Sequence, residues 1–184
     1  MGRTYNCLLV RHPQTEWNRD KRLCGQTDAA RWSDLGLTQA RDIAESLRGY
    51  AIKKIVSSDL NRAAYLAYII ATTLGGPVPV LDERLRELAL GELDGLRDDE
   101  AVARFTESRL SPYCDGYDLR SIGGEAQADV VERYQAAFHE HVVEEGVCVF
   151  VGHGFAFKAF LSSCDVATPV VQGSFVQLLY RKRG

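Results

Sequence analysis

Short apolar segments alternate along the chain with longer segments in which apolar residues recur at helical spacing. YNCLLV (5–10) and VCVFVG (147–152) are almost continuously apolar, and KKIVSS (53–58) is a shorter version. Such runs are typical of strands buried on both faces of a parallel sheet. A fourth run, SFVQLLYR (174–181), predicts a last strand at an edge of the sheet.

Four helices are predicted, over residues 33–49, 58–76, 125–145 and 155–163. Ser33 is a suitable N-cap for the first, and Gly49 a suitable stop. Alternating strands and helices predict an α/β fold, a three-layer sandwich with a mostly parallel central sheet and helices on both faces. With 184 residues and 46% hydrophobic content, we expect a single domain over 1–184. The looser segment 91–124 would form a small cap or insertion.

Composition narrows the function classes. Twenty-two basic and 25 acidic residues give a net charge of −3, so no global field attracts nucleic acid or an anionic membrane. The five cysteines include no CxxC pair, and no apolar run reaches the roughly 20 residues of a membrane span. The N-terminus lacks a secretory apolar segment. We therefore expect a reduced, cytoplasmic location, with Cys7 and Cys148 as buried apolar residues inside strands.

Unusual polar residues follow three of the predicted strands. Arg11 and His12 follow the first, Ser57 and then Arg62 the second, and His153 the third. Ligands of open α/β sheets bind beyond the carboxyl ends of strands, so these groups would meet in one crevice. Guanidinium groups suit phosphate oxygens, and a neutral imidazole can act as a nucleophile. The pattern indicates a site for a phosphate dianion.

The first backbone amides of the helix opening at Gly154 would also point at this anion. Zinc held by His12, His153 and Cys24 is the alternative. No pair among these three has the close spacing of a zinc site, and the neighbouring arginines would repel a cation.

Segments across the chain resemble motifs of the histidine phosphatase superfamily, in its phosphoglycerate mutase-like branch. The R-H-G-x-T-x-x-N signature is similar to RHPQTEWN (11–18), and the L-x-E-x-x-x-G-x-x-E-G motif to LRELALGELDG (85–95). Further similar stretches are LCGQTDAARWSDLGLTQA (23–40), SSDLNRA (57–63), GGE (123–125) and VGHG (151–154). The stretches occur in order over almost the whole chain.

The resemblance implies a phosphohistidine on His12, with Glu87 as general acid and then general base. Glu83 is the fallback for that acid. Arg11, Arg62 and His153 would hold the equatorial phosphate oxygens, assisted by Asn18, Thr15, Ser57 and the Gly154 amide. No metal or cofactor is required, because two guanidinium groups and an imidazolium offset the charge.

Three positions depart from the family pattern. Pro13 replaces a glycine, which removes a backbone donor and fixes φ near about −65°. It either weakens phosphate binding or holds His12 in place. Asp94 stands where glutamate is usual and Ala126 where serine is common. Neither departure removes a proposed catalytic group.

The sequence therefore predicts a phosphatase acting on a small phosphomonoester metabolite. A phosphomutase of phosphoglycerate mutase type is the alternative, although segment 91–124 is short for the insertions that retain a bisphosphate. A third alternative is a catalytically weak relative that binds a phosphorylated ligand, because of Pro13.

Substrate choice would lie in loop 19–32 and in the insertion, which contribute Arg19, Lys21, Arg22 and Trp32 and then Arg109, Tyr113, Tyr117 and Arg120. These residue types do not indicate whether the substrate is a phosphorylated sugar, a nucleoside or another small metabolite. The strand at 174–181 could pair with a copy of itself in a homodimer. His139 and His141 lie mostly off the apolar stripe of their helix, so we expect them to be exposed.

Overall fold

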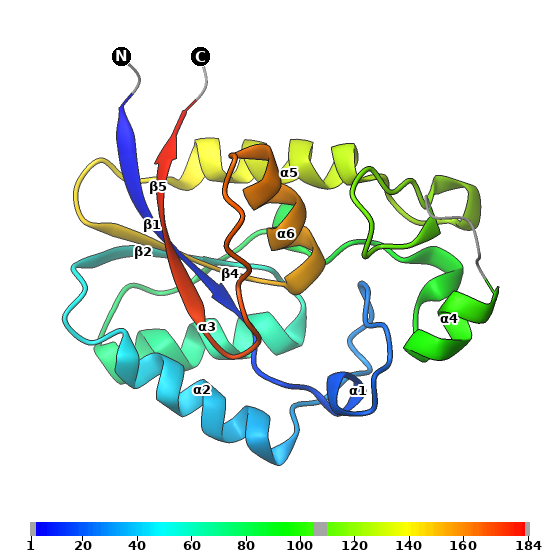
Figure 1. The fold of residues 1–184 in the computed structure, drawn as a ribbon. Coiled ribbons are helices and arrows are strands. Elements are labelled where there is room, and N and C mark those ends of the chain that lie inside the picture. The colour runs from blue at the N-terminus through cyan, green and yellow to red at the C-terminus, as the bar shows by residue number, and fades with distance from the viewer. Residues whose placement is uncertain (1–2, 105–109, 183–184) are drawn as a thin grey trace.

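A five-stranded sheet forms the centre of the protein (Figure 1). The computed structural model describes residues 3–104 and 110–182. The strands are β1 (Thr4–Arg11), β2 (Ile52–Ser57), β3 (Val80–Leu81), β4 (Val147–Gly152) and β5 (Phe175–Arg181), arranged in the order β3-β2-β4-β1-β5. All neighbouring pairs are parallel except β1 with β5. The mostly parallel sheet and its antiparallel edge strand confirm the predicted architecture.

Helices cover both faces of the sheet. The α-helices are α1 (Glu16–Arg19), α2 (Asp34–Ser46), α3 (Asn61–Leu74), α4 (Asp98–Arg104), α5 (Gln127–His141) and α6 (Gly154–Ser163), and the short 3-10 helices are η1 (Glu83–Leu85), η2 (Gly91–Leu93) and η4 (Arg120–Ile122). Helices α2 and α3 lie on one face, and α5 and α6 on the other (Figure 1).

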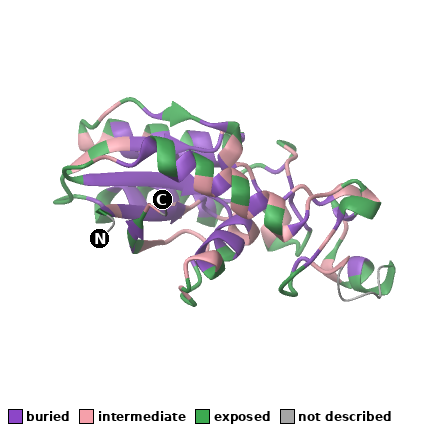
Figure 2. Ribbon diagram, turned by 90° about the horizontal axis from the view of Figure 1, so that it is seen from above, coloured by how far each residue is buried: buried purple, intermediate pink, exposed green. Residues whose placement is uncertain are grey.

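The two faces of the sheet belong to separate hydrophobic clusters, because successive strand residues point in opposite directions. In β1, Leu8 and Val10 join the cluster that includes α2 and α3, whereas Leu9 joins the one that includes α5 and α6. Phe150 of β4 stacks on Phe138 of α5 with ring centroids 3.7 Å apart. Figure 2 shows the buried residues concentrated in this middle layer. Each fully buried side chain of this size contributes about 1.5–3 kcal/mol.

Local side-chain contacts explain where two helices begin, and of these two only α2 has a side-chain cap. Ser33 accepts a hydrogen bond from Gly36 N at 3.1 Å, which confirms it as the N-cap of α2. Helix α3 begins at Asn61, three residues later than predicted, because Ser58 Oγ accepts from Leu60 N and Asp59 pairs with Arg86. Short elements without a periodic pattern, namely β3, α1 and α4, were not predicted.

His141 corrects one expectation. Its side chain is buried, and its Nε2 lies 2.9 Å from Asp82 Oδ2, whereas His139 is exposed as predicted. Asp82 comes from another part of the chain, so the helical stripe alone could not reveal this contact. Cys7 and Cys148 are fully buried, as expected. Burial raises the pKa of the Cys148 thiol to about 12.

The two ends of the insertion meet through a close backbone contact. Gly91 has φ +57°, and a Cβ there would lie 2.0 Å from Ile122 O, so only glycine lets the two segments approach. In the described part of the chain, no helix has both the length and the apolar character needed to cross a bilayer.

Candidate active site

Arg11, His12 and His153 lie together at the carboxyl ends of β1 and β4. Arg11 pairs with Gly152 in the register of the two strands, so the residues that follow leave the sheet side by side. The imidazole centroids of His12 and His153 are 5.2 Å apart and their planes are tilted by 58°. Their exposed fractions are 3% and 0%. The topology therefore brings together two histidines that are distant in the sequence.

The ring of His12 is oriented by the carbonyl of Pro13. Nδ1 lies 2.7 Å from Pro13 O; because a carbonyl only accepts hydrogen bonds, Nδ1 carries the proton and Nε2 the lone pair. Burial, followed by the charges of Arg62 and Arg11, lowers the pKa of His12 well below its ordinary value. His12 is therefore a neutral imidazole with a free Nε2 near neutral pH, as a nucleophile must be.

Four buried nitrogens at this place make no hydrogen bond to the described residues. They are Nδ1 and Nε2 of His153 and the Nε atoms of Arg11 and Arg62. Burial and the charge of Arg62 lower the pKa of His153 well below its ordinary value. Buried polar atoms in native proteins nearly always have partners. Two guanidinium groups and an imidazole N–H fit the oxygens of a tetrahedral anion.

Both arginines are held by main-chain contacts. Arg62 donates from Nη1 to Thr27 O at 2.7 Å and from Nη2 to Gly25 O at 2.6 Å. Arg11 donates to Val170 O at 3.3 Å and lies against Gly154, where a Cβ would be 2.7 Å from the guanidinium carbon. Glycine at 154 therefore lets the Arg11 guanidinium approach the start of α6.

Glu87 is 4% exposed, and three backbone amides donate to its carboxylate. Oε1 accepts from Leu88 N at 2.9 Å and Ala156 N at 2.8 Å, and Oε2 from Phe155 N at 3.1 Å. The first turn of α6 therefore binds Glu87, where the positive end of the helix dipole favours a carboxylate. This differs from the expectation that these amides point at the bound anion; the Gly154 amide remains a predicted contact.

Thr15 contributes to the site by positioning Asn18. Its Oγ1 donates to Asn18 Oδ1 at 2.9 Å and accepts from Asn18 N at 3.2 Å, which caps α1. Gln172 also donates to Asn18 Oδ1, so the amide nitrogen of Asn18 is the group left for a ligand. Ser57 is fully buried and donates to Ser58 O at 2.8 Å; it does not line the cavity described next.

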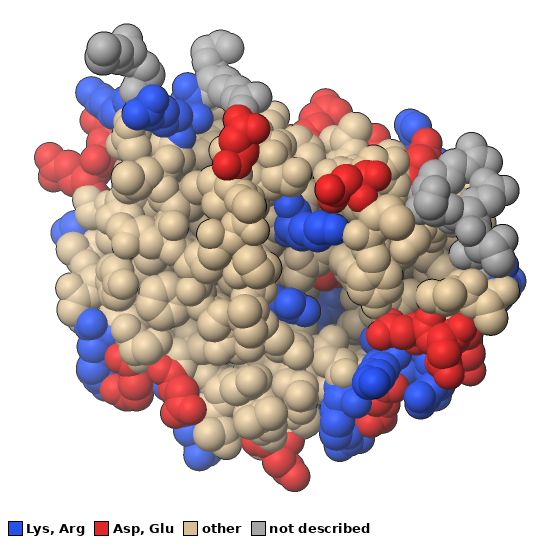
Figure 3. Space-filling view, in the orientation of Figure 1, with Lys and Arg blue, Asp and Glu red and all other residues tan. Residues whose placement is uncertain are grey.

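A cavity of about 390 Å³ has Arg11, His12, Asn18, Glu87 and Gly154 in its wall, whereas Thr15, Arg62 and His153 are not among the residues that line it. Figure 3 shows a hollow near the centre of this face with Lys or Arg side chains at its rim. The outer wall includes Lys21, Arg22, Cys24 and Tyr113 from the two segments predicted to select the substrate. Burial raises the pKa of the Cys24 thiol to about 11. Arg109 lies outside the described residues.

Sequence reasoning missed part of this wall, namely Lys158, Pro169, Val170 and Gln172. The last three precede β5. Because β5 is antiparallel to β1, the segment that enters it lies beside the carboxyl end of β1. Glu83 is exposed and does not line the cavity, and neither do Tyr117 and Arg120. Among the described residues, no group of three or more His, Cys, Asp or Glu side chains is arranged to hold a metal ion.

Comparison with known proteins identifies the family. The family model of the histidine phosphatase superfamily, branch 1, matches residues 7–170. The chain belongs to this superfamily. It is similar to the probable phosphoglycerate mutase GpmB of Enterobacter sp. strain 638, with 36% identity over 162 residues, which covers 84% of this chain and 72% of the relative.

It is also 31% identical to the 2,3-bisphosphoglycerate-dependent phosphoglycerate mutase of Brucella canis over 182 residues, covering 92% of this chain and 84% of that protein. Among solved structures, a mycobacterial glucosyl-3-phosphoglycerate phosphatase in complex with VO3 is similar, with a TM-score of 0.82 and 30% identity. The similarity covers 94% of this chain and 92% of that one.

Within this member of the histidine phosphatase superfamily, the departures at 94 and 126 can be placed in the structure. Asp94 Oδ1 accepts from Gly25 N at 2.9 Å, and Gly25 O in turn holds Arg62. The aspartate therefore supports the segment that orients an arginine of the site. Ala126 is the N-cap residue of α5 and has no side chain that can cap the helix.

Proposed function

We propose that the protein hydrolyses a small phosphomonoester through a phosphohistidine on His12. The supporting observation is that the rings of His12 and His153 lie together. Both ring nitrogens of His153 and the Nε atoms of Arg11 and Arg62 are buried without partners among the described residues. A substrate phosphate placed there would receive hydrogen bonds from His153 and the two guanidinium groups, and would face Nε2 of His12. Positioning and electrostatic stabilisation account for most phosphoryl-transfer catalysis.

In the first step, Nε2 of His12 attacks phosphorus and the bond from phosphorus to the alcohol oxygen breaks. Glu87 lines the same cavity and gives its proton to that oxygen. Glu87 enters this step as a carboxylic acid and leaves it as the carboxylate that the amides of Leu88, Phe155 and Ala156 hold. The proton on Nδ1 stays in its hydrogen bond to Pro13 O, which stabilises the ring as it gains positive charge.

In the second step, water attacks phosphorus and the bond from phosphorus to Nε2 breaks. Glu87, now a carboxylate, takes the proton from the water. His12 returns to its neutral form and inorganic phosphate leaves. General acid and base catalysis of this kind contributes about 10² to 10⁴ in rate.

His12→Ala tests this chemistry directly. We expect it to abolish phosphate release and the acid-labile, base-stable phosphate label on the protein, because it removes the nitrogen that attacks phosphorus in the proposed mechanism. His139→Ala, on an exposed face of α5, is the matched control and should retain both. EDTA should leave turnover unchanged. A label that persists in His12→Ala would refute the assignment of the nucleophile.

Phosphomutase activity is the second candidate, because two of the similar proteins named above are mutases by name. The short insertion 91–124 favours the hydrolase. A panel of phosphorylated metabolites, including sugar and nucleoside phosphates, 3-phosphoglycerate and a glycoside of it, decides the matter. Phosphate release and conversion of 3-phosphoglycerate to 2-phosphoglycerate are measured side by side. An acid-labile, base-stable phosphate label on His12 would exclude the third candidate, a relative that only binds a phosphorylated ligand.

A further inference from the structure

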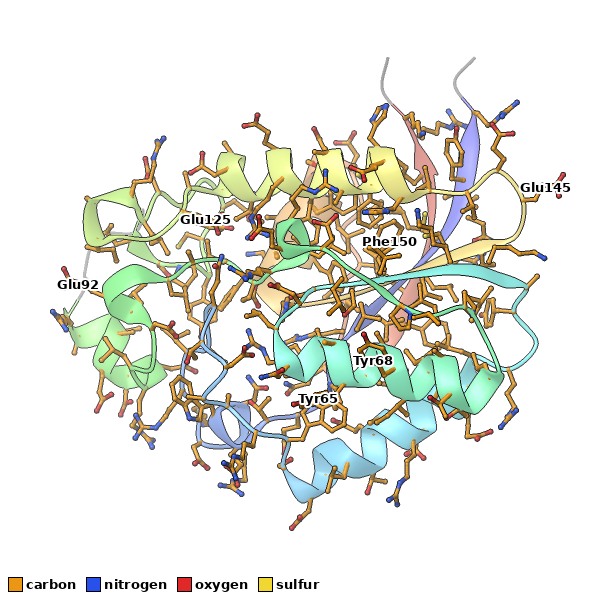
Figure 4. All side chains as sticks on the ribbon, turned by 180° about the vertical axis from the view of Figure 1, so that it is seen from behind. Tyr65, Tyr68, Glu92, Glu125, Glu145 and Phe150 are labelled. Atoms are coloured by element: carbon orange, nitrogen blue, oxygen red, sulfur yellow. The ribbon has the colours of Figure 1, made fainter. Side chains whose placement is uncertain are left out.

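The segment that carries Glu87 depends on side chains from elsewhere for its shape. Residues 86–89 form neither helix nor strand, yet Glu87 and Leu88 are buried. Backbone polar groups in a buried segment need hydrogen-bond partners. Here the main partners are Arg133 of α5 and Glu125, which lies just before that helix (Figure 4).

The guanidinium of Arg133 binds two carbonyls of this segment and one carbonyl just before it. Nη1 donates to Arg84 O at 2.8 Å and to Arg86 O at 2.6 Å, and Nη2 donates to Glu87 O at 3.0 Å. The side chain of Arg133 is only 16% exposed. One rigid, planar group therefore fixes the main chain immediately before and at Glu87.

Glu125 holds the main chain immediately after Glu87. Its Oε2 accepts from Ala89 N at 2.8 Å, and its own N donates to Ala89 O at 2.9 Å. The same carboxylate binds Arg133 through two hydrogen bonds, of 2.8 Å from Nε and 2.9 Å from Nη2. The ion pair therefore makes hydrogen bonds to the main chain on both sides of Glu87. We name Arg133 and Glu125 the clamp.

We propose that the clamp positions Glu87 for proton transfer, so that Arg133 and Glu125 are positioning residues of the reaction. This inference rests on the proposed function, in which Glu87 protonates the departing alcohol. The clamp sets the main chain at 87, and the amides of Leu88, Phe155 and Ala156 then hold the carboxylate at the cavity. A misplacement of about 1 Å at such a group can cost about 10²-fold in rate. The clamp also gives a role to Glu125 of the GGE motif.

The test compares substrates that differ in their need for an acid. An alkyl phosphate requires protonation of its alkoxide, whereas the phenolate of 2,4-dinitrophenyl phosphate leaves without it. We expect Arg133→Lys and Glu125→Gln each to lower kcat/KM for the alkyl phosphate about 10- to 100-fold, part of the range of general acid catalysis. The value for the dinitrophenyl ester should change little. The ratio kcat/KM reports the steps up to phosphoryl transfer to His12.

Two further variants complete the design. Arg48 forms an ion pair with Glu45 on an exposed surface, so Arg48→Lys is the matched control and should leave both substrates unaffected. Glu87→Gln should show the same substrate-selective loss as the clamp variants. Adding Arg133→Lys to Glu87→Gln should then produce little further loss, because both substitutions remove one function. Equal losses for both esters, or full additivity in the double variant, would overturn the proposal.

A second measurement does not depend on turnover. The amide resonances of Phe155 and Ala156 report the hydrogen bonds to Glu87, and we expect Glu125→Gln and Arg133→Lys to move them in the direction seen with Glu87→Gln. Unchanged resonances would overturn the proposal. If the wild-type protein places no phosphate on His12, the proposed function has failed, and these resonances still show whether the clamp positions Glu87.

Discussion

At the scale of single residues, Pro13 combines a departure from the family with a contact to the candidate nucleophile. Its carbonyl accepts the Nδ1 proton of His12, and this acceptor does not require glycine. What proline removes is the amide proton, and what it adds is a fixed φ. The sequence indicates both the lost amide proton and the fixed φ, but the direction of the Pro13 carbonyl depends on the folded structure.

We expect Pro13→Gly to lower kcat/KM for an aryl phosphate about two- to tenfold, because the orienting carbonyl gains freedom, and to lower the free energy of unfolding by ~0.5–1 kcal/mol. Steady-state kinetics and urea unfolding measure the two effects. A faster Pro13→Gly variant would show instead that the missing amide proton limits phosphate binding.

At the scale of elements, α5 begins without a side-chain cap. Ala126 has the extended backbone of an N-cap residue, φ −85° and ψ 160°, and Asp129 N already donates to its carbonyl at 3.1 Å. We expect Ala126→Ser to raise the free energy of unfolding by ~0.5–1 kcal/mol, since a serine hydroxyl can accept from the first-turn amides. Ala136→Ser, the same change on the exposed middle of α5, should be neutral or destabilising. Urea unfolding measures the stability of both variants. Equal changes in the free energy of unfolding would argue against a capping role for the serine at 126.

Elements with a long apolar signal were predictable, and contacts between elements were not. The runs at 5–10 and 147–152 became β1 and β4, because continuous burial imposes apolar residues on every position. Strand β3 has two residues, too few for any pattern. The same division applies to the site. Strand ends revealed His12 and His153, whereas Arg133 bonds to the main chain of a distant segment and leaves no motif around itself.

At the scale of the whole molecule, burial of two neutral histidines makes stability depend on pH. The pKa values of His12 and His153 are lowered in the folded protein, while an unfolded histidine titrates near about 6.5. The unfolded chain therefore binds more protons as pH falls below that value. The stabilisation is present above about pH 6.5 and is lost as the pH falls toward the lowered pKa values of the folded protein. Each histidine contributes a loss of up to ~1.4 kcal/mol per pH unit.

We expect urea unfolding of the wild-type protein to show this loss between about pH 7.5 and about pH 5.5, and His153→Gln to reduce it. His139→Gln, on an exposed residue, is the control and should keep the wild-type slope. If the free energy of unfolding depended on pH identically in all three proteins, the pH dependence could not be assigned to His153. We also propose that residues 1–184 unfold as one domain, in a single transition. Pairing of two copies through the edge of β5 stays a prediction, which sedimentation equilibrium can test by measuring the mass in solution.

The antiparallel pairing of β1 with β5 has a consequence for engineering the chain. Thr4 is the register partner of Arg181, so the first residue of β1 and the last residue of β5 lie side by side (Figure 1), at the end of β1 away from His12. A short peptide can therefore join them, and the ring can be reopened at Gly75-Gly76, in the turn after α3. Such a circular permutant keeps every strand pairing while reversing the order in which the two halves of the cavity are synthesised.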